Sequence, residues 1–388
     1  MKKKLKVAVF TGTRAEYGLL YWLLKDIKND SAFELQLLVS GTHLSPEFGN
    51  TINEIENDGF IADEKIEILL SSDTSVGVAK SVGLGILSFA DALDRLRPDI
   101  IVILGDRFEA LAVAQTSMIL RIPILHLHGG EITEGAYDDS IRHAITKLSY
   151  LHATAAEQYR KRVIQLGESP ERVFNVGAIG LDHISRSSFM SINELSESLN
   201  FEINKDYMIV TYHPATLANE TPEETFKNLL KALDHFQNYQ IIFTYPNADD
   251  GGRKIIPLLE AYSDSYPKRV LAIPSLGHHR YLSAVKNSSL IIGNSSSGII
   301  ESPAFRIPAV NIGTRQMGRL SADSVLDCDT DESSIVSAIT SALDNDYKNT
   351  DVQINNPYGQ GNASQEIIKI LKSFSFDAVK EFYNIEDF

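Results

Sequence analysis

Short apolar runs alternate with longer segments of helical periodicity along the first half of the chain. The runs are bounded by turn residues, as buried parallel strands are, and they cover residues 7–10, 35–39, 100–104, 124–127 and 173–176. Between them, apolar residues recur at helical spacing in residues 17–28, 78–96 and 138–151. This repeated alternation predicts a doubly wound α/β sheet with helices on both faces.

A polar, Ser-rich stretch over residues 185–206 interrupts the pattern, and the alternation then restarts. The later strands are expected at residues 208–212, 241–245, 270–273, 290–292 and 309–312, and a last helix at residues 365–373. We therefore expect two Rossmann-like domains, 1–182 and 183–365, with a ligand cleft between the carboxyl ends of their sheets. A helical segment, 366–388, is expected to pack back on the first domain.

Composition narrows the function classes. The 388 residues carry a formal net charge of -15, which opposes binding to nucleic acid. Cys328 is the only cysteine, so no intrachain disulfide can form and a reducing, cytoplasmic compartment is expected. No apolar run approaches the roughly 20 residues that span a bilayer, and no membrane association is expected. The start of the chain lacks a long apolar leader segment and fits a first strand better.

The densest group of reactive side chains follows two predicted strands. Asp106 and Arg107 come directly after the strand at residues 100–104. The strand at residues 124–127 leads into the segment HLHGGEITEGAYDDSIRHAITK, which contains His128 and Glu131. Carboxyl ends of parallel strands face the ligand crevice, so these side chains are expected at one mouth.

A helix is expected to begin in the same segment near Asp138 or Asp139, either of which would serve as its N-cap. Arg142 lies on the same helical face as these carboxylates, at spacings of three and four residues. Three interpretations stay open at this point: a divalent metal site, a set of caps and ion pairs, and acid–base chemistry on a bound anion. The last is the one we favour.

The first strand runs into TGTRAEYG without the glycine spacing of a dinucleotide-binding loop. Arg14 and the free N–H groups of the following helix would hold an anion there, and Glu16 is counted with them. The alternative is a plain helix start in which Glu16 is a favourable first-turn charge.

Strand ends in the second half carry polar residues of a different kind. His213 and Asn247 each follow a predicted strand, and Arg315 follows another. The segment IIGNSSSGIIE places Ser295, Ser296 and Ser297 at the opening of a helix, where hydroxyls and N–H groups would cradle a diphosphate. Glu301 would accept two hydrogen bonds from vicinal ribose hydroxyls. Serines that merely cap the helix are the alternative.

These motifs together resemble a known family. The segments GTRAEYG, LGDRFEA, HGGEITEG, DDSIRHAITK, YHP, GNSSSG and NIGTRQMGR occur in the order found in the hydrolysing UDP-N-acetylglucosamine 2-epimerases, which have the glycosyltransferase-B fold. The resemblance covers nearly the whole chain. It implies that UDP is eliminated from UDP-N-acetylglucosamine to give 2-acetamidoglucal, and that water then adds to release N-acetylmannosamine, a precursor of sialic acid-type sugars.

The resemblance also implies roles for individual residues. Asp106, Glu131 and Asp138 match the catalytic acids of the family, with Arg142 and His213 in supporting positions. Because some members have Glu where this chain has His128, either His128 or Glu131 would fill one acid–base role. The nucleotide contacts implied are Arg14, Asn247, Ser295, Ser296, Glu301 and Arg315, and we count His43, Arg107, Glu16 and Ser297 with the substrate-binding set.

Neither a cofactor nor a metal is expected for this chemistry. A homodimer is expected from the resemblance, and the apolar helix around residues 78–92 offers a surface for it. The substrate alternative is UDP-N,N'-diacetylbacillosamine, with the stretch LSSDTSVGVAKSVGLG beside its extra substituents. The remaining alternatives are a non-hydrolysing epimerase, a glycosyltransferase of the same fold and a UDP-sugar-binding protein without activity.

Overall fold

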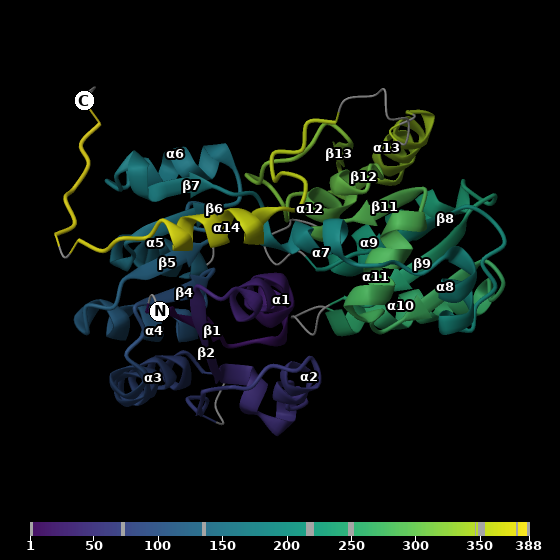
Figure 1. Cartoon of the computed structure of the whole chain (residues 1–388). Coiled ribbons are helices and arrows are strands. Elements are labelled where there is room, and N and C mark those ends of the chain that lie inside the picture. Colours follow the sequence, from purple (N-terminus) through teal and green to yellow (C-terminus); the bar gives the residue numbers. More distant parts are fainter. Residues whose placement is uncertain are drawn as a thin grey trace. The chain divides into compact units, whose positions relative to one another are not determined.

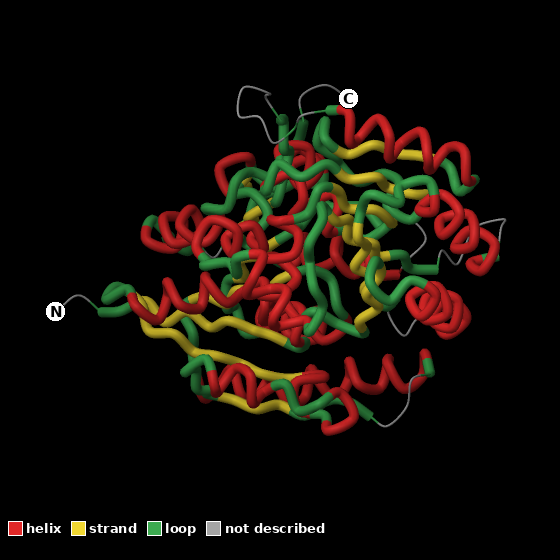
Figure 2. Tube along the Cα trace, turned by 90° about the vertical axis from the view of Figure 1, so that its right-hand side faces the viewer, coloured by secondary structure: helices red, strands yellow, loops and turns green. Residues whose placement is uncertain are grey.

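The computed structural model describes residues 3–70, 74–133, 137–214, 221–246, 252–345, 347, 354–377 and 379–385. The chain divides into two compact units (Figure 1). The first unit comprises Met1–Ser185 and Gly361–Phe388, and the second comprises Arg186–Gln360. In each unit the strands lie between helices, as Figure 2 shows in yellow and red. The C-terminal segment therefore belongs to the first unit.

The first unit is built on a parallel sheet of seven described strands in the order β3-β2-β1-β4-β5-β6-β7. The strands are β1 (Leu5–Thr11), β2 (Phe33–Ser40), β3 (Glu64–Ile66), β4 (Ile100–Leu104), β5 (Ile124–Leu127), β6 (Leu151–Thr154) and β7 (Val173–Asn175). Leu104 pairs with Leu127, so β4 and β5 end level with each other. The loops that follow these two strands therefore start side by side.

Helices cover both faces of this sheet. They are α1 (Arg14–Asn29), α2 (Ile52–Asn57), α3 (Ser75–Leu96), α4 (Phe108–Ile119), α5 (Tyr137–Leu148), α6 (Glu157–Gln165), α7 (Asp182–Arg186) and α14 (Ala363–Lys372), with short 3₁₀ turns η1 (Gly41–Leu44), η2 (Pro46–Phe48), η3 (Pro170–Arg172) and η4 (Ile179–Leu181). One apolar core joins α1 and α14 to the sheet through residues such as Leu20 and Ile367. The other joins α3 and α4 to it through Phe89 and Val113.

The second unit repeats the architecture with six described parallel strands in the order β10-β9-β8-β11-β12-β13. The strands are β8 (Tyr207–Thr211), β9 (Gln240–Thr244), β10 (Val270–Ile273), β11 (Leu290–Gly293), β12 (Ala309–Ile312) and β13 (Val325–Cys328). The helices are α8 (Ile192–Leu199), α9 (Pro222–Asp234), α10 (Gly252–Ser265), α11 (Gly277–Asn287), α12 (Ser297–Ala304) and α13 (Glu332–Asp344). At Gly293, φ is 136° and an added Cβ would lie 1.9 Å from the Thr211 oxygen, so only glycine fits.

The predicted fold class, two doubly wound α/β domains, is confirmed, but several details were wrong. The helix expected over residues 138–151 ends at Leu148, because β6 begins at Leu151. That strand, LHAT, carries a histidine and lacks the continuous apolar run by which buried strands are recognised. Strands β3 and β13 were also missed, since both are short edge strands with charged residues.

The expectation that no segment is long and apolar enough to cross a membrane also needs correction. Among the described residues, α3 is the one helix whose length and composition would suffice. Its glycines, serines and alanines break the apolar run in the sequence without making the helix polar. One side of α3 packs on the sheet through Phe89, Ala92 and Leu93, and Gly85 lies against Ala112 of α4. This helix is therefore part of the core of the first unit.

The C-terminal helix α14 is joined to the first unit by a buried carboxylate. Asp182 accepts hydrogen bonds from the backbone N–H groups of Ala363 (2.8 Å) and Ser364 (2.7 Å). All three residues are buried. The first N–H groups of a helix have no acceptor within the helix, and an N-cap side chain usually provides one. In α14 the carboxylate of Asp182, which is distant in the sequence, provides these acceptors.

We predict that Asp182→Ala lowers the free energy of unfolding of the first unit by about 2–4 kcal/mol, because it leaves two buried N–H groups without an acceptor. Urea unfolding followed by circular dichroism measures this loss. Asp182→Asn keeps one acceptor oxygen and should lose clearly less. Equal stability of the Ala variant and the unchanged protein would contradict this role.

Candidate active site

The loop that carries Asp106 is fixed by β5 through both the N–H and the carbonyl of Gly105. Gly105 donates its N–H to the Leu127 carbonyl (3.1 Å), and its own carbonyl lies 2.8 Å from His126 Nε2. Since a carbonyl only accepts, the proton of His126 is on Nε2. Gly105 adopts a positive φ of 74°, which glycine allows at no steric cost. The backbone before Asp106 is therefore held from the neighbouring strand.

His126 is buried, and burial lowers the pKa of its imidazole to about 3. Its Nδ1, which carries no proton, lies 3.1 Å from the hydroxyl of Thr146 on α5, and the single hydrogen of that hydroxyl is shared between Nδ1 and the Arg142 carbonyl (3.0 Å). The neutral ring thus connects the Asp106 loop to α5. Sequence reasoning did not include His126 in the site, because only the fold brings its partners Gly105 and Thr146 near.

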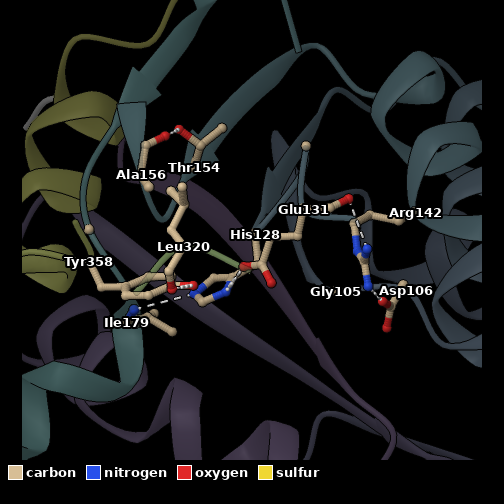
Figure 3. Close-up of polar contacts among 12 residues, drawn as sticks. Gly105, Asp106, His128, Glu131, Arg142, Thr154, Ala156, Ile179, Leu320 and Tyr358 are labelled. Carbon is tan, nitrogen blue, oxygen red and sulfur yellow. Dashed lines mark hydrogen bonds and ion pairs between the residues drawn. The ribbon is translucent and has the colours of Figure 1, made fainter. Parts of the chain in front are cut away.

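Arg142 is the centre of the site (Figure 3). Its guanidinium pairs with the Asp106 carboxylate and donates to the Glu131 carbonyl (2.9 Å) and the Thr133 hydroxyl (3.0 Å). Asp139 lies 3.6 Å away on the same helix. The structure therefore brings the predicted Asp106, Glu131 and Arg142 together, and it adds Thr133, which sequence reasoning missed.

His128 and Glu131 form a second pair (Figure 3). His128 Nδ1 lies 2.9 Å from Glu131 Oε1, and the N–H of Ile179 donates to Nε2 at 3.3 Å. An acceptor at Nε2 places the proton on Nδ1, from which it is donated to Glu131. His128 also has a positive φ of 62°, which is uncommon for a residue other than glycine. The sequence left open whether His128 or Glu131 fills one acid–base role, and in the structure the two side chains are hydrogen-bonded to each other.

Asp138 lies in the first turn of α5, which begins at Tyr137. The helix starts earlier than expected, so neither Asp138 nor Asp139 is its N-cap; Asp139 instead accepts from the Thr133 N–H at 2.8 Å. Burial raises the pKa of the Asp138 carboxyl, and the charge of Asp106 raises it further. Asp106 is thus a carboxylate paired with an arginine, and its neighbour Asp138 has a raised pKa. Two carboxyl groups in such different environments are suited to act as a base and an acid.

Two residues expected to contact substrate make hydrogen bonds within the fold. Glu16 accepts from the N–H groups of Gly12 (2.8 Å) and Thr13 (3.0 Å) and completes a capping box at the start of α1, so the alternative helix-start interpretation holds. His43 is buried between the hydroxyls of Thr11 and Thr51, at 3.0 Å and 2.8 Å.

The two expected arginines are more accessible. Arg14 pairs with the exposed Glu54 at 2.8 Å. The Arg107 guanidinium binds the buried Glu109 through Nε (3.1 Å) and Nη2 (3.0 Å). Arg107 also lines a cavity of about 1040 Å³ in the first unit.

In the second unit, Asn294 ties two strand ends together. Its side chain accepts from the His213 N–H (2.7 Å) and donates to the His213 carbonyl (2.8 Å). Its carbonyl accepts from Arg315 Nη1 (2.9 Å) and Gln316 Nε2 (2.8 Å). The structure therefore places His213 and Arg315 around one residue that sequence reasoning missed. Asn247 lies outside the described residues.

The predicted serines stand at the start of α12. Ser296 precedes the helix, Ser297 begins it, and the Ser297 hydroxyl accepts from the Tyr281 hydroxyl at 2.7 Å. Burial raises the pKa of the Glu301 carboxyl, whose Oε2 has no hydrogen-bond partner among the described residues. A buried carboxylate oxygen without a partner is a place where a ligand hydroxyl would be satisfied.

The described residues contain no group of three His, Cys, Asp or Glu side chains that could hold a metal ion. The titratable groups named above are held instead by arginine, histidine and backbone N–H groups.

Comparison with known proteins gives consistent results over most of the chain. Residues 25–372 match the family described as UDP-N-acetylglucosamine 2-epimerase. The chain is 43% identical over 329 residues to the GDP/UDP-N,N'-diacetylbacillosamine 2-epimerase (hydrolyzing) of Campylobacter jejuni, covering 85% of each chain. It is 36% identical to the polysialic acid biosynthesis protein P7 of Escherichia coli, covering 98% of each.

The fold is likewise shared with solved structures. The UDP-GlcNAc 2-epimerase of Neisseria meningitidis, solved with UDP-GlcNAc bound, superimposes with a TM-score of 0.79 at 18% sequence identity. The alignment covers 95% of this chain and all of that one. At this identity the likeness concerns the fold.

Burial raises the pKa of Glu16 from its ordinary value of 4.5 to about 7, opposed in part by the Gly12 N–H. The folded chain then holds a proton between these pH values that the unfolded chain has released. The free energy of unfolding should therefore fall as pH rises from 4.5 through 7, by an amount on the order of 2–3 kcal/mol. Glu16→Gln, whose amide oxygen still accepts from Gly12 and Thr13, should remove this part of the pH dependence.

Urea unfolding at a series of pH values compares the two proteins. Glu54→Gln, at an exposed carboxylate of the same unit, is the matched control and should follow the unchanged protein. If the Glu16→Gln variant keeps the full pH dependence, Glu16 is ionised throughout this range.

Proposed function

Because the chain belongs to the UDP-N-acetylglucosamine 2-epimerase family, we propose that it is a hydrolysing enzyme that releases UDP from a UDP-2-acetamido sugar and inverts the sugar at C2. The observation that carries the proposal is that Arg142 pairs with the Asp106 carboxylate and holds the backbone of the loop that carries Glu131, at the carboxyl ends of β4 and β5, with Asp138 close enough for the charge of Asp106 to raise its pKa. With UDP-N-acetylglucosamine and water, the products are UDP and N-acetylmannosamine. The released N-acetylmannosamine would be a precursor of sialic acid-type sugars.

The proposed reaction has two steps. In the first, a carboxylate removes the proton from C2 while the C1–oxygen bond breaks, and the bonding electrons leave with UDP to give 2-acetamidoglucal. In the second, water adds its oxygen to C1 and a proton is delivered to the opposite face of C2. Proton transfers account for every bond change, so the proposal calls for no metal or redox cofactor.

The environments of the acids support a division of roles. Asp106 is paired with Arg142, which orients its carboxylate, and we assign it the role of proton acceptor. Asp138 has a raised pKa and holds a proton more readily, which suits it to donate one. The hydrogen-bonded pair of His128 and Glu131 carries one further proton and would serve the second face of the sugar ring.

The second unit would bind the nucleotide. Charge develops on the diphosphate as UDP leaves, and the Ser295–Ser297 segment with Arg315 would stabilise it through hydroxyls, helix N–H groups and one guanidinium. Glu301 Oε2, which has no partner among the described residues, would accept the ribose hydroxyls. His213 and Asn247 complete the proposed contacts.

A second candidate substrate is UDP-N,N'-diacetylbacillosamine. The Campylobacter jejuni relative named for that activity is 43% identical to this chain, compared with 34% for the UDP-N-acetylglucosamine 2-epimerase of Neisseria meningitidis. Both sugars carry the 2-acetamido group that the proposed elimination requires.

Turnover of either UDP-sugar with water alone tests the proposal. Phosphorus NMR should show free UDP accumulating, and proton NMR in D₂O should show deuterium at C2 of the released sugar. A mixture of two UDP-sugars without free UDP would mean a non-hydrolysing epimerase. Tight UDP binding without any product would mean a binding protein.

We predict that Asp106→Asn and Glu131→Gln each lower kcat by about 10²–10⁴-fold, because each removes an ionisable group from the proton transfers. UDP affinity, measured by calorimetry, should change by less than about threefold, since the proposed diphosphate contacts lie on the second unit. Asp94→Asn, at an exposed carboxylate of the first unit, is the control and should keep full activity. Activity within about fivefold of the unchanged enzyme in both site variants would remove these residues from the chemistry.

The proposed assembly is a homodimer in the cytoplasm, without nucleic-acid or membrane partners. Exposed apolar side chains gather on α3 and at the end of the adjoining α4: Val76, Leu84, Leu87, Met118, Ile119 and Leu120. Apolar surface of this kind on packed helices is typical of a protein interface. The single cysteine suits a reducing compartment.

We predict that the double variant Leu87→Glu/Ile119→Glu converts a dimer to a monomer in analytical ultracentrifugation. Leu87 is 70% exposed and Ile119 68% exposed, so the folded monomer should tolerate both changes. Ile61→Glu, at another apolar side chain of the first unit that is 84% exposed, should remain dimeric. A double variant that stays dimeric would place the interface elsewhere.

A further inference from the structure

One hydrogen bond of the second unit has no role in the proposed reaction. It joins Tyr281 on α11 to Ser297, the first residue of α12, and the two hydroxyl oxygens are 2.7 Å apart. The Tyr281 ring packs against an apolar core that includes Tyr207 and Leu276, so the place of its hydroxyl is fixed. A side chain from outside α12 therefore holds a serine at the helix start where the nucleotide is proposed to bind.

The hydrogen of this bond comes from Tyr281. Burial raises the pKa of the Tyr281 phenol more than the bond to Ser297 lowers it, and the nearby charge of Glu301 raises it further. The phenol therefore keeps its proton at neutral pH and donates it to the Ser297 oxygen. A serine hydroxyl has a single hydrogen of its own, and that hydrogen is left for another acceptor.

The acceptor is the Glu301 carboxylate, four residues after Ser297 on the same face of α12. Burial raises the pKa of this carboxyl, and hydrogen bonds from its own backbone N–H and from the Ser297 hydroxyl counter part of the rise. Glu301 Oε2 has no hydrogen-bond partner among the described residues. The chain of hydrogen bonds from Tyr281 through Ser297 thus ends on a carboxylate that still has an unused acceptor.

Resting on the proposed function, we infer that Tyr281 is a positioning residue for recognition of the nucleotide ribose. Its hydroxyl fixes the Ser297 hydroxyl, which holds the Glu301 carboxylate so that Oε2 accepts from a ribose hydroxyl. Without Tyr281 the Ser297 hydroxyl turns freely, and ordering the carboxylate costs part of the binding free energy. Ser297 acts through Glu301, and Ser295 and Ser296 supply the hydroxyls of the proposed diphosphate cradle.

The test compares the binding of UDP and of 2',3'-dideoxyuridine diphosphate, which lacks both ribose hydroxyls, by calorimetry. The unchanged protein should bind UDP at least about tenfold more tightly, since a site built to accept a hydroxyl rejects the analogue without it. Tyr281→Phe removes one hydrogen bond and should raise the Kd for UDP by about fivefold. The Kd for the dideoxy analogue should change by less than about twofold, because its sugar offers Glu301 nothing to accept.

Tyr266→Phe is the matched control, because it removes an exposed tyrosine hydroxyl from the same unit, and it should leave both Kd values unchanged. Ser297→Ala breaks the same chain of hydrogen bonds one step later and should weaken UDP binding by a similar factor. The double variant of Tyr281→Phe and Ser297→Ala should then bind UDP no more weakly than either single variant, whereas losses that multiply would mean independent roles. In turnover, Tyr281→Phe should raise KM for the UDP-sugar and leave kcat within about twofold, because the proposed proton transfers involve residues of the first unit.

The outcomes distinguish this inference from the proposed function. If the protein prefers UDP to the dideoxy analogue but releases UDP from no UDP-sugar, the proposed function fails and the variants still decide the role of Tyr281. If it turns over a UDP-sugar but Tyr281→Phe weakens both ligands equally, or neither, the inference is wrong and the proposed function stands. Circular dichroism shows whether each variant is folded, and if Tyr281→Phe is not, Ser297→Ala alone decides by the same comparison.

Discussion

The buried guanidinium of Arg142 is the constraint on which the first unit's site depends. A charge removed from water must be paired and fully hydrogen-bonded, and here its partners come from the loop after β4, the loop after β5 and α5. Only arginine offers enough donors in a fixed plane to reach all of them. The same contact that stabilises the charge therefore fixes Asp106 relative to the Glu131 loop, and a lysine would not reproduce it.

Much of the fold follows from local pattern, and the failures have local causes. Buried central strands such as β4 and β5 are continuous apolar runs with defined ends, so their limits were predictable to the residue. Strand β6 was missed because pairing with β5 and β7, and not its composition, makes LHAT a strand. The start of α5 was misplaced because Asp139 caps a backbone N–H of the preceding loop, at Thr133, and not the helix itself.

The grouping of the acids could be expected from strand order alone, since adjacent parallel strands end at one edge. The residues that fix the two sites could not be predicted in this way, because His126 contacts the Gly105 carbonyl and Asn294 contacts the His213 backbone, and only tertiary structure brings these atoms together. Glu16 and His43 also belong to residue types that suit a ligand site, and both make hydrogen bonds within the fold. Whether the protein completes the hydrogen bonds of a side chain is therefore one criterion for comparing candidate ligand contacts.

That criterion separates the carboxylates of the two units. In the first, Asp106 and Glu131 have partners, and bound substrate would have to exchange with or share them, as proton transfer requires. In the second, Glu301 Oε2 is buried with no partner among the described residues. Such groups cost folding free energy in the empty protein and recover it when a ligand hydroxyl or carbonyl completes them. On this criterion, the proposed chemistry involves carboxylates that already have partners, and the proposed ribose contact involves one that has an oxygen without a partner.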